Sequence, residues 1–233
     1  MAEQKKETFS EVNKIDQYRT VDELMERSKP STAYYTLLVL SSFIVAAGLL
    51  VGNAAIVIGG MLVMPVLTPL LLISLGVSIG DLNLVRRTGR LVGKSLLIVV
   101  TSSFFLGLVF GINGAPDFFV LEDTLRGAVL YFIVAAAAGF AATFAWAHKD
   151  MSEILPGVAI AVSLVPPLAL IGIGFSIFSF EMIRYNFFIF FFNLLGVLIG
   201  SMLVFSMLKF YKVEKKVEQE VEKQEQEERD GKK

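Results

Sequence analysis

The chain has no cysteine and a single histidine among its 233 residues. These absences exclude disulfides, thiolate metal sites and cysteine nucleophiles, and they leave almost no ligands for a transition metal. Charge is also scarce, because charged residues make up 18% of the sequence, apolar residues make up 55%, and the mean hydropathy is +0.66. We therefore expect neither a soluble enzyme, nor a nucleic-acid-binding protein, nor a disordered chain, and we expect no cofactor.

The charged residues that do occur collect at the two ends of the chain. Residues 1–32 hold six basic and seven acidic side chains, residues 209–233 hold eight of each, and the 176 residues between them hold 14. This distribution predicts a membrane domain at 33–208, between a polar N-terminal segment at 1–32 and a charged tail at 209–233.

Within the membrane domain, several apolar runs reach the length of about 20 residues that a helix needs to cross the hydrocarbon core. None of them has an acidic residue or an arginine well inside it. We predict an all-α, polytopic membrane protein with six transmembrane helices, at about 33–52, 54–79, 91–112, 126–147, 154–178 and 186–208.

Basic residues set the expected orientation. With the N-terminus in the cytoplasm, twelve basic residues near the spans lie inside and two, Arg126 and Arg184, lie outside. Such an asymmetry predicts a multi-pass protein of the cell membrane with both termini cytoplasmic. One cytoplasmic cluster stands out, and we interpret it as a topology determinant that contacts anionic lipid, with a substrate or regulatory site as the alternative. It consists of Arg86, Arg87, Arg90 and Lys94.

The second and fifth apolar runs resemble each other at a constant offset. The aligned pairs are Gly59 with Gly157, Pro69 with Pro167, and Gly76 with Gly174. This match divides the chain into three plus three spans. Because three crossings is an odd number, related halves would run in opposite senses, as in the inverted repeats of secondary transporters. A chance match of short Gly, Pro and Leu patterns is the alternative.

Prolines lie near the middle of both runs, with Pro65 and Pro69 in the second and Pro166 and Pro167 in the fifth. A proline in a helix lacks an N–H and frees the carbonyl four residues before it. Irregular backbone at membrane depth needs protein or water around it. We therefore predict that helices two and five are broken at these prolines and line a substrate or ion path. Simple kinks that assist packing are the alternative.

Neutral residues complete the predicted path. Asn193 either contacts a freed carbonyl or a substrate, or it joins two helices. Asn53 either closes a tight turn or lies beside the broken segment. The full set adds Gly59, Gly60, Met61, Thr68, Gly157 and Ser163 to these two and to the four prolines. No nucleophile with a base and an orienting group is evident, and His148 is interpreted as an interfacial side chain, so we expect no catalytic site.

Two further patterns concern packing. Apolar residues recur at three- and four-residue spacing over residues 10–29, which predicts a surface helix that either lies along the membrane interface or is a polar segment before the first span. Small residues four positions apart indicate close helix packing, and they are the basis for an expected homo-oligomer. These patterns are Gly76-x3-Gly80, Ala135-x3-Gly139 and Gly196-x3-Gly200.

Two stretches resemble the membrane proteins grouped as domain of unknown function 389. The first runs from Asn53 to Met61 and is followed by two prolines, Gly80-Asp81 and Arg86-Arg87, and the second runs from Leu155 to Ala161 and is followed by Pro166-Pro167-Leu168. The resemblance covers about residues 30–210. It implies a multi-span membrane domain and carries no particular reaction or substrate. Thr68 departs from the pattern, since a small residue such as glycine is expected there.

The sequence thus favours a transporter or channel for a small solute or ion. Half-helix N-termini would suit an anion and freed carbonyls would suit a cation, and the sequence does not choose between them. The alternative is a non-transporting membrane scaffold whose cytoplasmic tails bind partners or lipid.

Overall fold

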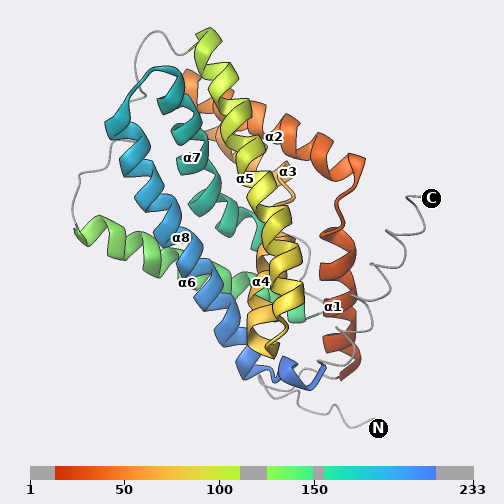
Figure 1. The fold of residues 1–233 in the computed structure, drawn as a ribbon. Helices are drawn as coiled ribbons and strands as arrows, with labels where there is room; N and C mark the ends of the chain where they lie inside the picture. The colour runs from red at the N-terminus through yellow and green to blue at the C-terminus, as the bar shows by residue number, and fades with distance from the viewer. Residues whose placement is uncertain (1–13, 111–124, 149–154, 214–233) are drawn as a thin grey trace, which may run out of the picture.

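The structure, a computed structural model, describes residues 14–110, 125–148 and 155–213. The remaining parts of the predicted N-terminal segment and C-terminal tail, residues 1–13 and 214–233, lie outside the described residues. All described elements are helical (Figure 1). They are α1 (Lys14–Arg27), α2 (Thr32–Val51), α3 (Ala54–Val63), α4 (Leu67–Ile79), α5 (Leu82–Phe110), α6 (Leu125–Ala147), α7 (Leu155–Ser176), α8 (Phe180–Met207) and the 3-10 turn η4 (Phe210–Val213).

Four described segments are long and apolar enough to cross a membrane, namely α2, α5, residues 129–147 of α6, and α8, and the bent pair α3–α4 makes a fifth if it is one span. Large apolar side chains face outward on these helices. Leu97 is 66% exposed and Phe188 is 54% exposed. Broad apolar surfaces of this kind are unfavourable in water and favourable in lipid. The chain therefore fits a multi-pass membrane protein.

Helix α7 is central, because it packs against α2, α3, α4, α5, α6 and α8. The prediction that helix five is broken at its prolines is wrong, since α7 continues from Leu155 to Ser176 with Pro166 and Pro167 inside it. Neighbouring helices can hold a proline-containing helix together and keep lipid from its weakened backbone. At the constant offset, Ser163 of α7 aligns with Pro65 of the second run. Ser163 has a backbone N–H, which Pro65 lacks.

The contact between α6 and α8 depends on small residues. A Cβ added at Gly196 would lie 2.6 Å from the carbonyl oxygen of Phe132, and additions at Gly139 and Gly200 would collide with backbone of the opposite helix. Two of the predicted packing patterns are thus confirmed, within one chain. The third pattern, Gly76-x3-Gly80, does not pack at its second glycine. Gly80 ends α4 in the left-handed conformation, at φ 83°, and no atom lies within 4 Å of the position that a Cβ would take.

The turns after α4 and α7 match at the offset of the predicted repeat. The Gly76 carbonyl accepts a hydrogen bond from the Asp81 N–H at 2.9 Å, and the Gly174 carbonyl accepts one from the Ser179 N–H at 3.0 Å. The side chains of Asp81 and Ser179 then each accept a hydrogen bond from a backbone N–H in the first turn of the following helix. Local backbone geometry therefore agrees with the sequence match at this point.

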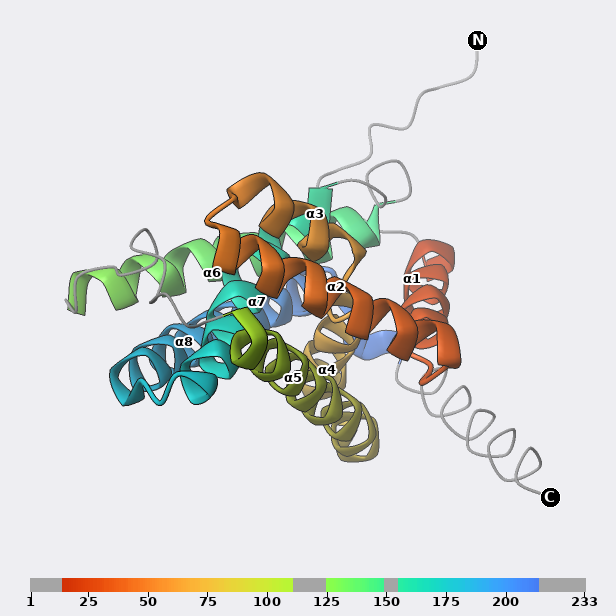
Figure 2. The same ribbon diagram turned by 90° about the horizontal axis from the view of Figure 1, so that it is seen from above.

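Helix α1 stands beside the lower part of the bundle, next to α4, at the right of Figure 1 and of Figure 2. Gln17 donates from Nε2 to the Leu208 carbonyl at 2.7 Å, and Thr20 donates from its hydroxyl to the Trp146 carbonyl at 3.2 Å. These carbonyls lie at the C-terminal ends of α8 and α6. Carbonyl groups in the last turn of a helix have no N–H partner within that helix, so α1 supplies the missing donors. The predicted surface helix is present, and Leu24 is fully buried.

Candidate functional site

The second apolar run is interrupted at Met64–Val66, where α3 and α4 meet at an angle of 58°. Pro65 has no N–H, and the last turn of α3 closes early when the Met64 N–H donates to the Met61 carbonyl at 3.2 Å. Pro69 lies in the first turn of α4, where a missing N–H costs little. Val66 gives α4 no side-chain cap. The break therefore leaves carbonyls at the end of α3 and N–H groups at the start of α4 without helical partners.

A cavity of about 410 Å³ opens at this interruption. We call it the break cavity, and its lining includes Met61, Pro65, Thr68, Arg27 and Trp146. The Arg27 guanidinium lies 5.1 Å from the centroid of the Trp146 ring, in cation–π geometry. The Thr68 hydroxyl is 3.5 Å from the Arg27 carbonyl oxygen. Three predicted path residues are thus brought together on one cavity.

Charge around the break cavity is unbalanced. Glu26 and Lys29 both line it, and they pair with each other at 2.8 Å. The Arg27 cation remains, and the N-terminus of α4 adds the positive end of a helix dipole beside it. The cavity therefore favours negative charge.

Behind the break, α4 and α7 meet at an apolar seam. The space there is about 10 Å³ and is lined only by apolar side chains from α4, α5, α7 and α8 and from the break, including Met64, Leu70, Leu164 and Leu168. A water molecule needs at least that much room and also two or more polar partners. The seam is therefore dry in this conformation, and it is lined by residues that flank the prolines of both runs, such as Val66 and Val165.

The other predicted path residues take separate places. Asn53 caps α3 by accepting hydrogen bonds from the N–H groups of Ala55 and Ile56, at 3.0 and 3.3 Å, which supports its interpretation as a turn residue. Gly60 packs against α2, whereas Gly59 has open space around it. Asn193 is buried in α8. Gly157 and Ser163 lie in α7, and their surroundings are outside what the structure describes.

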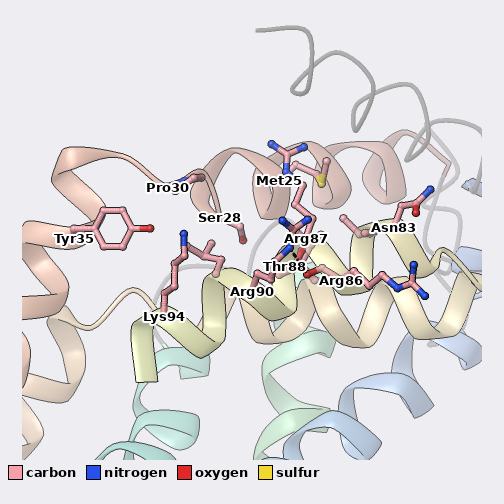
Figure 3. Close-up of a pocket in the computed structure, with 13 residues that line it drawn as sticks. Met25, Ser28, Pro30, Tyr35, Asn83, Arg86, Arg87, Thr88, Arg90 and Lys94 are labelled. Atoms are coloured by element: carbon pink, nitrogen blue, oxygen red, sulfur yellow. Dashed lines mark hydrogen bonds between the residues drawn. The ribbon is translucent and has the colours of Figure 1, made fainter. Parts of the chain in front are cut away.

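A second cavity, of about 430 Å³, lies between the C-terminal end of α1 and the N-terminal part of α5 (Figure 3). We call it the basic cavity, because its lining holds four basic residues and no acidic residue. They are the four members of the predicted cluster, Arg86, Arg87, Arg90 and Lys94. Helix α5 begins at Leu82, before the apolar run expected from residue 91, so these residues lie on a helix.

Sequence reasoning missed three contributors to these cavities. These are Arg27 and Trp146 at the break cavity and Ser28 at the basic cavity. No local signal marks them, because their cavities form between distant segments. His148 follows the last residue of α6, and its Nδ1 lies 2.8 Å from the Phe144 carbonyl oxygen.

Comparison with known proteins gives a family and one distant relative. The family described as Domain of unknown function (DUF389) matches residues 61–199. An "Uncharacterized protein MJ0678" of Methanocaldococcus jannaschii is 26% identical over 208 residues, which cover 88% of this chain and 62% of the relative. The chain thus spans less than two thirds of that relative's length. No solved structure matches the chain.

Proposed function

The chain belongs to the DUF389 family, and from this premise we propose that it is a membrane transporter or channel for a small solute or ion. The observation that carries this proposal is the break cavity, which ends on the interrupted segment between α3 and α4 and is lined by Met61, Pro65 and Thr68. Backbone groups without helical partners at membrane depth are found where they line a path or contact protein. In this conformation the apolar seam closes the path.

A small anion is the solute that the break cavity fits best. The pairing of Glu26 with Lys29 leaves Arg27 as the net charge of the lining, and the uncapped N-terminus of α4 presents N–H groups beside it. Both features attract negative charge. A cation would meet the freed carbonyls only after it passed this positive charge.

We further propose that the six spans form an inverted repeat of three plus three, with α7 as the fifth span. The paired hydrogen bonds that follow Gly76 and Gly174 support this arrangement, because they occur at the offset of the sequence match. In this arrangement α3–α4 and α7 are equivalent elements. One is broken and the other is continuous because Ser163 takes the place of Pro65.

The end of the bundle that carries α1 would face the cytoplasm. Arg27 on α1, the cluster at the start of α5, and Lys209 after α8 all belong to this end, because the C-terminal end of α1 and the start of α5 line the same basic cavity and Gln17 of α1 donates to the Leu208 carbonyl. Figure 1 shows the α7–α8 turn at the opposite end. Basic residues favour the cytoplasmic side of a membrane.

The dry apolar seam favours a second candidate, a non-transporting membrane scaffold. Its tails would then carry the function by binding partners or lipid. Removing residues 214–233 separates the two, because a scaffold should lose its partner and a transporter should keep its flux.

The test is uptake of radiolabelled chloride and sodium into proteoliposomes. We expect chloride uptake above that of protein-free vesicles. Pro65→Ala should lower it, because alanine restores an N–H and allows α3 and α4 to join as one helix. Gly89→Ala, in open space on α5 and outside the predicted path, is the control. Equal uptake by Pro65→Ala and the wild type would count against a path through the break.

A further inference from the structure

The basic cavity holds more positive charge than its surroundings balance. Arg86, Arg90 and Lys94 are four residues apart on α5, so they lie on one face of the helix. Like charges at this spacing repel and destabilise a helix. Among the described residues, no acidic side chain forms an ion pair with any of these three. A negatively charged ligand would remove the repulsion.

A buried hydroxyl faces the same space. Ser28 is 7% exposed, and its Oγ has no hydrogen-bond partner in the described part of the chain. In Figure 3 its hydroxyl points from the end of α1 toward α5, into the cavity that Arg90 and Lys94 also line. A buried hydroxyl without a partner costs free energy that an acceptor oxygen on a ligand would recover.

The position of the basic cavity indicates where such a ligand would come from. The side chains of α5 beyond Lys94 include the exposed apolar residues Leu97 and Phe105. The cavity therefore lies where the polar end of α5 gives way to its apolar part, which is the depth of lipid headgroups. Its volume of about 430 Å³ is larger than one phosphate needs and suits a headgroup.

We propose that the basic cavity binds a phosphate group, held by Arg90, Lys94 and the Ser28 hydroxyl. Arginine pairs well with phosphate because its planar guanidinium donates two parallel hydrogen bonds, and lysine adds a point charge. The phosphate belongs either to an anionic lipid or to a soluble phosphate compound. This inference is independent of transport through the break cavity, because the two cavities share no lining residue.

The experiment measures binding to the full chain in dodecyl maltoside, a detergent that carries no phosphate. Retention of added phosphatidylglycerol is followed by native mass spectrometry, with phosphatidylcholine as the neutral comparison, and inorganic phosphate is titrated separately. Arg90→Gln should weaken binding about tenfold, which corresponds to about 1.4 kcal/mol. Ser28→Ala should weaken it less and leave the charge unchanged. Lys209→Gln, which removes an exposed cation at the same end of the bundle, should have little effect.

The outcomes separate the two phosphate sources. Preferential retention of phosphatidylglycerol that inorganic phosphate does not displace assigns the cavity to a lipid headgroup. Direct binding of inorganic phosphate that displaces the lipid assigns it to a soluble phosphate. Absence of both, or equal weakening by Lys209→Gln and Arg90→Gln, overturns the proposal. Arg90→Lys keeps the charge and should recover part of the affinity, which distinguishes lost binding from lost folding.

Discussion

Replacing Gly196 with alanine should destabilise the protein, because the new methyl group would press on α6. Its Cβ would lie 2.6 Å from the Phe132 carbonyl oxygen, about 0.8 Å inside the 3.4 Å at which ordinary contact begins. Overpacking of this kind costs about 1–3 kcal/mol, and the better helix propensity of alanine returns about 0.5–1 kcal/mol. At the midpoints of these ranges the net loss is about 1 kcal/mol, which lowers the melting temperature of a chain of this size by roughly 2–4 °C.

The assay is thermal denaturation in detergent, followed by circular dichroism at the helix band. Gly59→Ala is the matched control, since it makes the same change in a helix where no atom lies within 4 Å of the added Cβ. It should leave the melting temperature unchanged or raise it. The packing argument would be refuted if Gly196→Ala melted at or above the wild type, or if the two variants melted together.

Three further predictions use the same preparation. Thr20→Val should cost about 1 kcal/mol, because the Trp146 carbonyl loses its donor from α1; an unchanged melting temperature would contradict the role of this hydrogen bond. Gly80→Ala should cost about 1–2 kcal/mol because φ is 83° there, whereas Gly89→Ala, also in open space, should not. Trp146 is the sole tryptophan and is 5% exposed, so acrylamide should quench its fluorescence weakly, and Arg27→Gln should shift its emission. Strong quenching of the wild type would show that the indole is not packed as described.

Hydropathy was enough to predict an all-α chain built of apolar helices, because helix length and apolar content are local properties. The helix ends were less predictable. Helix α5 begins at Leu82, because its charged turns remain helical outside the apolar run. The prolines also differ in effect. The chain is interrupted at Pro65, whereas Pro166 and Pro167 lie within the continuous, surrounded α7.

Contacts between distant segments could not be predicted. Gln17 reaches the Leu208 carbonyl across 191 positions of sequence, and Arg27 meets Trp146 only because α1 crosses the end of α6. Small-residue patterns show that a close contact exists but do not name the partner. Those at Gly139 and Gly196 are used between α6 and α8 of one chain. The homo-oligomer therefore stays a prediction that these patterns no longer support.

The most direct test of the central claim is thiol labelling, because the chain has no cysteine of its own. Single variants Thr68→Cys, Leu168→Cys, Asn53→Cys and Lys209→Cys are treated with a membrane-impermeant reagent from either side of sealed vesicles. If the break cavity is a water-filled mouth at the positively charged end, Thr68→Cys reacts from the same side as Lys209→Cys, Asn53→Cys reacts from the other side, and Leu168→Cys in the apolar seam is protected. If Thr68→Cys stays unreactive while Lys209→Cys is labelled, or reacts from the side of Asn53→Cys, the proposed mouth of the path is contradicted.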